Sequence, residues 1–115
     1  MRHDLGPVAG IPRGEGRLFR IGGMTVAVFR TRGEEVFATQ PWCTHRQGPL
    51  ADGIVAAGKV ICPLHAYKFD LATGQALAHE CAGLVTYEVT VDAGGHVEVH
   101  LPLAAVAGEG QESHA

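Results

Sequence analysis

Residues 43–65 read CTHRQGPLADGIVAAGKVICPLH, and they hold two short motifs that each combine a cysteine with a histidine. In the first motif His45 follows Cys43 by two positions, and in the second His65 follows Cys62 by three. Sixteen residues, 46–61, separate the motifs. Because each motif offers one thiolate and one imidazole, two loops that carry them could each supply both ligand types to one binuclear metal centre.

Three interpretations fit these four side chains. In one, two thiolates hold one iron of a [2Fe-2S] cluster and two imidazoles hold the other. Zinc also accepts two sulfurs and two nitrogens, but finger-type zinc sites usually take their cysteines from one motif and their histidines from another, whereas both motifs here are mixed. A metal-free coincidence is the third interpretation, since single cysteines and histidines are often ordinary core or surface residues.

The segments around the motifs resemble the Rieske proteins from about residue 26 to residue 99. The matching segments are VAVFR, CTH, GPLADGIV, CPLHAYKFDLATG and LVTYEVTV. The resemblance implies one [2Fe-2S] cluster per chain, with Cys43 and Cys62 on the inner iron and His45 and His65 on the outer iron near solvent. It also implies an all-β fold, a small antiparallel Rieske-type β sandwich or barrel with an inserted cluster-binding subdomain.

Alternation of apolar and polar residues predicts strands and no sustained helix. The period of two is clearest over residues 85–92 and 96–101, which the turn Asp92-Ala93-Gly94-Gly95 joins. Gly22-Gly23 predicts a tight hairpin turn. The other predicted strands cover residues 17–21, 24–30, 36–39, 59–61 and 67–71.

A chain of 115 residues is long enough for one domain with a modest core. We predict a Rieske domain over residues 1–103, with a cluster-binding unit at about 41–70. Residues 104–115 are small and polar, which predicts a flexible tail.

Charge and composition narrow the possible partners and location. The net charge is −3 and basic residues are scattered, so nucleic acid is not an expected partner. The N-terminus lacks the apolar region of a secretory signal, and no run approaches the ~20 apolar residues of a membrane span. Cys81 has no evident disulfide partner and is predicted to be a structural thiol. We therefore expect a cytoplasmic protein in a reducing compartment, with no membrane partner.

The resemblance also bears on the reduction potential. High-potential members link the two loops by a disulfide, at positions that are Gly48 and Leu64 here, and place serine and tyrosine donors where this chain has Tyr67 and Phe69. Hydrogen bonds to the sulfurs help to set Rieske potentials, which span roughly −150 to +300 mV. A potential in the lower half is therefore expected.

Apolar residues beside the two motifs have two interpretations. They could form a rim around the imidazoles on which a partner docks, or the loops could simply pack on each other. The predicted rim residues are Trp42, Pro49, Leu50, Pro63 and Leu64.

Three functions follow from the resemblance, all of them without a catalytic site in this chain. The first is the small subunit of an NAD(P)H-dependent assimilatory nitrite reductase, a one-electron carrier whose redox partner is the large subunit. The second is a ferredoxin that carries electrons from a ferredoxin reductase to a ring-hydroxylating oxygenase. Thr44 is common at its position in such ferredoxins, whereas the nitrite reductase subunits usually have proline there. A structural or zinc-binding subunit is the third. Gly14-Glu15-Gly16 lacks the third glycine of a dinucleotide fingerprint, so substrate chemistry is expected in the partner.

Overall fold

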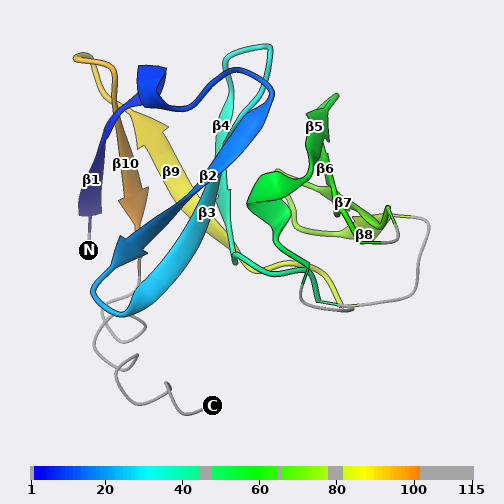
Figure 1. The fold of residues 1–115 in the computed structure, drawn as a ribbon. Coiled ribbons are helices and arrows are strands. Elements are labelled where there is room, and N and C mark those ends of the chain that lie inside the picture. Colours follow the sequence, from blue (N-terminus) through cyan, green and yellow to red (C-terminus); the bar gives the residue numbers. More distant parts are fainter. Residues whose placement is uncertain (1, 45–47, 65, 78–81, 102–115) are drawn as a thin grey trace.

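The computed structural model describes residues 2–44, 48–64, 66–77 and 82–101, which form two antiparallel sheets (Figure 1). The strands of the larger sheet are β1 (Arg2–Pro7), β2 (Glu15–Ile21), β3 (Met24–Arg30), β4 (Val36–Thr39), β9 (Thr86–Val91) and β10 (His96–His100). Their order in the sheet is β1-β10-β9-β4-β3-β2.

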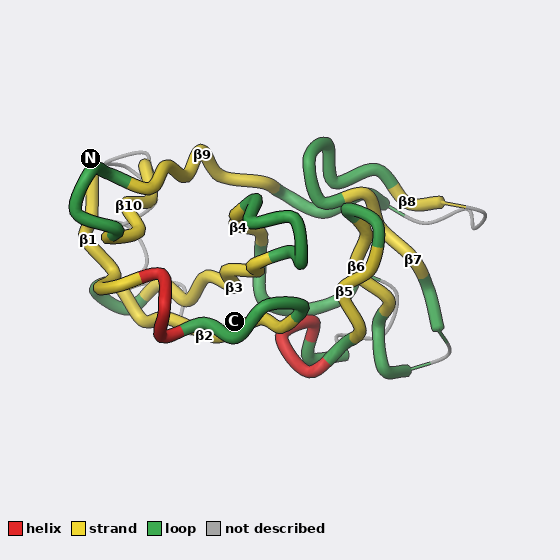
Figure 2. Tube along the Cα trace, turned by 90° about the horizontal axis from the view of Figure 1, so that it is seen from above, coloured by secondary structure: helices red, strands yellow, loops and turns green. Residues whose placement is uncertain are grey.

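The smaller sheet is made of short strands from the middle of the chain. These are β5 (Ile54–Ala56), β6 (Lys59–Ile61), β7 (Lys68–Asp70) and β8 (Ala76–Leu77), in that order. The only helical turns among the described residues are two 3-10 turns, η1 (Val8–Gly10) and η2 (Leu50–Asp52). Figure 2 shows that the larger sheet curls, with β9 along one side and β2 along the other, while the smaller sheet lies at one end. The predicted antiparallel all-β fold is confirmed.

Strand β3 is buried on both of its faces, as its almost continuously apolar sequence predicts. Val26 and Val28 point into a core enclosed by the curled sheet, here called the inner core, which also contains Val97 and Val99. Ala27 and Phe29, which alternate with them along β3, point the other way. Ala27 belongs to a second core, here called the lobe core, which β3 shares with the smaller sheet. One strand therefore forms the wall between the two cores.

The smaller sheet is an insertion into the larger one. The chain leaves the larger sheet after β4 and returns to it at β9, and Thr39 pairs with Thr86 in register. The next residue extends the ladder by one bond, because the Gln40 N–H donates to the Val85 carbonyl at 2.9 Å. The two ends of the segment 41–84 therefore lie side by side where β4 and β9 pair in the larger sheet. We call this segment the inserted lobe.

The strands predicted from alternation are present within two residues of their expected bounds, and Gly22 turns the β2–β3 hairpin at a φ of +67°. Strands β1, β5 and β8 were not predicted. β1 contains Gly6 and Pro7 and has a register shift between Asp4 and Pro7, so its conformation depends on pairing with β10. β5 and β8 have three and two residues, too few to show a period. The predicted tail, residues 104–115, lies outside the described residues.

Candidate metal centre

The two motif cysteines lie in one core although they come from different loops. Cys43 follows β4 and Cys62 follows β6, and each is 1% exposed. Both belong to the lobe core, where Leu50 and Leu84 are their buried neighbours. The fold thus brings together two cysteines that are nineteen positions apart in the chain.

Each cysteine stands at the base of a loop that closes on itself. The Cys43 N–H donates to the Gly48 carbonyl at 2.8 Å, and the Cys62 N–H donates to the Tyr67 carbonyl at 2.7 Å. A bridge between Trp42 and Pro49 continues the first closure. His45 and His65 follow these cysteines within the two closed loops, but both histidines lie outside the described residues.

The surroundings of the Cys62 thiol change its pKa. Burial raises the pKa of the Cys62 thiol, and the neighbouring Cys43 thiol raises it further. The Leu64 N–H opposes this by donating to the Cys62 Sγ at 3.4 Å, which favours the thiolate. Two buried thiols side by side lose their protons readily only when a cation takes the place of the protons. This donor pair therefore fits a metal centre, and it could supply the sulfur half of a [2Fe-2S] site.

Gly48 allows the two loops to approach closely. A Cβ at this position would lie 2.6 Å from the Cys62 Sγ and 3.1 Å from the Leu64 Cγ, well inside van der Waals contact. Gly53, beside η2, has no room either, because a Cβ there would overlap the Ile61 carbonyl oxygen. The sequence singled out Gly48 as a position without the loop cysteine and, with Pro49, as part of the loop that holds the ligands, but it did not predict this contact with the Cys62 sulfur.

The surface beside the cysteines is partly apolar. Trp42 is 43% exposed and Leu64 is 40% exposed, and Pro63 is also exposed, as the predicted rim requires. Leu50 is not part of a rim, because it turns inward and is fully buried. A hollow of about 310 Å³ opens beside Cys62, lined by Asp52, Gly53, Ile54, Ile61, Cys62, Pro63 and Ala66.

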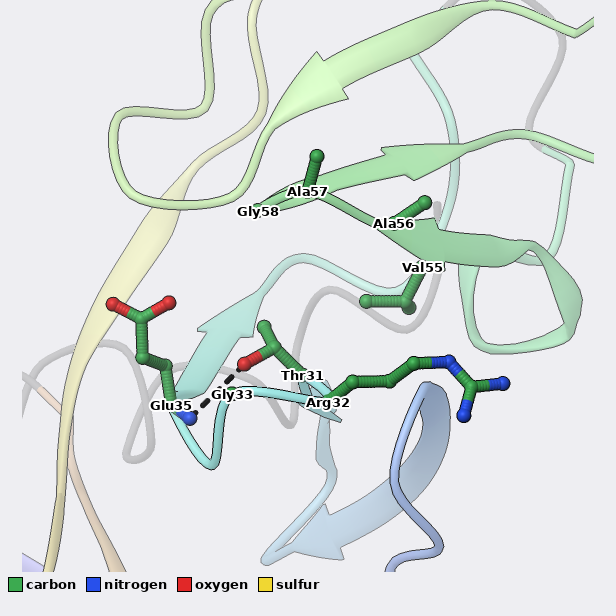
Figure 3. Close-up of a pocket in the computed structure, with 8 residues that line it drawn as sticks. All are labelled: Thr31, Arg32, Gly33, Glu35, Val55, Ala56, Ala57 and Gly58. Carbon is green, nitrogen blue, oxygen red and sulfur yellow. Dashed lines mark hydrogen bonds between the residues drawn. The ribbon is translucent and has the colours of Figure 1, made fainter.

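A second hollow, of about 430 Å³, lies between the β3–β4 turn and the β5–β6 turn (Figure 3). The Glu35 N–H donates to the Thr31 Oγ1 at 3.0 Å and fixes one of its walls. Val55, Ala56 and the Ala57-Gly58 turn form the opposite wall. Its lining includes none of the predicted ligands, so we do not assign it to the metal centre.

Of the four predicted ligands, the structure brings Cys43 and Cys62 together. The other two, His45 and His65, are outside the described residues, and so is Cys81. Within the described ranges, no group of three or more His, Cys, Asp or Glu side chains gathers as a metal site. The same ranges contain no helix long and apolar enough to cross a membrane.

The chain belongs to the family of Rieske-like [2Fe-2S] domains, whose family model matches residues 3–100. It is 36% identical over 100 residues to the 3-phenylpropionate/cinnamic acid dioxygenase ferredoxin subunit of Escherichia coli strain K12, covering 85% of this chain and 92% of that protein. The protein is thus a Rieske-type electron-transfer domain, and its family implies one [2Fe-2S] cluster.

Two solved structures extend the comparison. The first, a complex of reduced oxygenase and oxidized ferredoxin in carbazole 1,9a-dioxygenase, is 29% identical with a TM-score of 0.75, covering 85% of this chain and 100% of the matched one. The second is described as a putative nitrite reductase NADPH small subunit. It is also 29% identical, with a TM-score of 0.77, covering 88% of this chain and 99% of the other. Both predicted roles therefore have relatives of the same fold.

Proposed function

We propose that this protein is the ferredoxin component of a ring-hydroxylating oxygenase system, carrying single electrons from a reductase to the oxygenase. The observation that carries this proposal is the 36% identity to a dioxygenase ferredoxin subunit, which extends over 100 residues and so spans both sheets. Thr44 agrees with it, because the resemblance associates threonine at this position with such ferredoxins. We expect the protein to work in the cytoplasm.

We further propose that Cys43, Cys62, His45 and His65 hold the cluster, within a domain of residues 1–103 whose cluster-binding unit is about 41–70. The buried thiol pair supports the sulfur half of this assignment. When bound, a [2Fe-2S] cluster accepts and releases one electron. The lobe core keeps water from the thiols, and the Leu64 N–H stabilises negative charge on the Cys62 sulfur.

The proposed potential is in the lower half of the Rieske range of roughly −150 to +300 mV. Gly48 and Leu64 lie against each other and cannot form a disulfide, and Phe69 is buried without a hydroxyl to donate. Fewer donors to the sulfurs leave more electron density at the iron, so reduction is less favourable. Protein-film voltammetry measures this value directly.

A second candidate is the small subunit of an NAD(P)H-dependent nitrite reductase, which the solved putative nitrite reductase small subunit favours. Both candidates need a redox partner that docks near the cluster. Exposed Trp42 and Leu64 offer apolar contact area for such a partner.

The two candidates are separated by the partner that the cluster-loaded protein binds. Protein with two irons and two labile sulfides per chain, immobilised as bait in a native extract, should retain an oxygenase. The eluted fraction should consume oxygen in the presence of an aromatic substrate when it is supplied with this protein, the electron carrier, in chemically reduced form. Siroheme absorbance and nitrite-dependent reoxidation of the carrier would instead establish the second candidate, and zinc without labile sulfide would contradict both.

A further inference from the structure

The junction between the larger sheet and the inserted lobe changes from backbone pairing to side-chain pairing. The β4–β9 ladder ends one residue beyond Thr39, where the Gln40 N–H bonds to the Val85 carbonyl. The next residue, Pro41, has no N–H and cannot continue the ladder. The same register carried further would set Cys43 opposite Ala82.

Side chains take over where the ladder stops. The Gln40 Oε1 accepts from the Val85 N–H at 2.7 Å, and the Gln40 Nε2 donates to the Trp42 carbonyl at 2.9 Å. The Thr44 hydroxyl donates to the Ala82 carbonyl at 2.6 Å. We call the loop that begins at Cys43 and closes at Gly48 the first ligand loop. These bonds connect it and the preceding Gln40 to residues 82–85, which are 38 to 45 positions away in the chain.

Residues 82–85 are themselves fixed from the other side. The Leu84 N–H donates to the Gly74 carbonyl at 2.7 Å, and the Leu84 side chain is 6% exposed in the lobe core beside Cys43 and Cys62. Gly74 has no room for a Cβ, which would overlap the Leu84 carbonyl oxygen. The segment is therefore a rigid support against which the first ligand loop can be held.

We propose that Thr44 is a positioning residue whose hydroxyl locks the first ligand loop onto residues 82–85. Thr44 stands between Cys43 and His45 in the sequence. Its bond to Ala82 therefore restrains the backbone that joins two of the proposed ligands. The inference rests on the proposed ligand set.

The test compares Thr44→Val, which keeps the shape and removes the donor, with Thr44→Ser, which keeps the donor. In Thr44→Val, iron release to a chelator should be about two- to tenfold faster, the range expected for one lost hydrogen bond. The reduced cluster should also show broadened EPR lines, because the loop samples more than one position. Thr44→Ser should restore both values. Thr90→Val, on an exposed position of β9, is the control and should behave as the wild type.

The outcomes distinguish failure of this inference from failure of the proposed function on which it rests. Wild-type release rate and EPR line widths in Thr44→Val would overturn it, even if the melting temperature fell, since that pattern belongs to a residue that only stabilises the fold. Failure of Thr44→Ser to restore both would overturn it as well. Absence of an iron-sulfur cluster from the wild-type protein would instead overturn the proposed function. If Thr44→Val does not fold, the release rate of Thr44→Ser against Thr44→Ala decides.

Discussion

Gly48 stands where the protein has no room for a side chain. Its carbonyl accepts the bond that closes the loop beginning at Cys43, and a Cβ on it would meet the Cys62 sulfur. A glycine is required here by contact between two loops and not by an unusual φ, since no positive φ is recorded for it. The first loop can thus lie directly on the second.

Substitution of Gly48 by alanine should therefore disturb the metal centre. The added Cβ would meet the Cys62 Sγ at 2.6 Å, and relieving that overlap moves the sulfur or the loop. We expect purified Gly48→Ala to contain less iron per chain, and its metal-free form to lose about 1–3 kcal/mol of unfolding free energy, as for other overpacked cores. Iron analysis and urea unfolding measure the two effects.

Gly10→Ala is the matched control, because a Cβ at Gly10 meets nothing within 4 Å and no positive φ is recorded there. It should keep both the iron content and the stability of the wild type. Equal iron content in Gly48→Ala and Gly10→Ala would contradict the role given to Gly48.

Strand β1 is attached to the edge of the larger sheet partly through a charged pair. The Asp4 carboxylate lies 3.0 Å from the His96 Nδ1 on β10. Hydrogen bonds from the Gly6 N–H and from His96 lower the pKa of Asp4, and Asp4 raises the pKa of His96 through a hydrogen bond and its charge. Asp92 and Glu98 add smaller contributions in the same direction for His96.

The pair makes the stability of the protein depend on pH. The raised pKa of His96 gives a contribution that is complete below about pH 6.5 and is lost as pH rises through the folded-state value. The lowered pKa of Asp4 gives one that is complete above about pH 3.8 and is lost as pH falls. From pH 6 to pH 8 the wild type should therefore lose slightly more stability than Asp4→Asn, as measured by urea midpoints.

Glu15→Gln serves as the control for that comparison. The Glu15 carboxylate pairs with Arg17, which keeps its charge over this range, so the variant should follow the wild-type profile. A wild type and an Asp4→Asn variant whose midpoints fall in parallel would show that the Asp4–His96 pair does not titrate as described.

The strands that sequence alone predicted are those whose own side chains carry a pattern or that adjoin a recognisable turn. β9 and β10 alternate and β3 is almost continuously apolar, while β2 was predicted from the Gly22-Gly23 turn that follows it. β1 and β8 take their conformation from a neighbouring strand, which no local pattern records. The Ala57-Gly58 turn was missed for a different reason: Ala57 adopts a φ of +54°, which alanine rarely does.

The candidate site divides in the same way. The cysteine and histidine spacing predicted Cys43 and Cys62 as neighbours, because all four candidate ligands lie in two short motifs. The bonds of Gln40 and Thr44 to residues 82–85 were not predicted, since they depend on the register between β4 and β9. Leu50 was placed in the exposed rim because it is an apolar residue close in sequence to the first motif, whereas η2 turns it inward.

The described residues form two cores, and Cys43 and Cys62 lie together in one of them. That core is the lobe core, while the inner core is built from the larger sheet and, among the residues that the structure describes, contains neither cysteine. Metal-ligand free energy is also folding free energy, so it should stabilise the two cores unequally.

Removal of the iron should therefore loosen the inserted lobe first. Amide hydrogen exchange of Val60 and Phe69, in the smaller sheet, should accelerate strongly in metal-free protein. Exchange of Val26 and Val99, in the inner core, should change much less. Mass spectrometry of exchanged peptides compares the two regions in one sample, and equal acceleration in both would contradict a stability difference between the cores.

The two ends of the inserted lobe meet at a single rung, where Gln40 bonds to Val85. A segment that begins and finishes at adjacent points on neighbouring antiparallel strands does not stretch the sheet that carries it, but the core of this lobe also takes Ala27 and Phe29 from β3. Transplanting residues 41–84 into another β protein, with Gln40 and Val85 as the splice points, would therefore need an acceptor hairpin flanked by a strand that replaces β3. The smallest unit that could be grafted is thus the lobe together with three neighbouring strands, of which the third supplies apolar side chains to the lobe core.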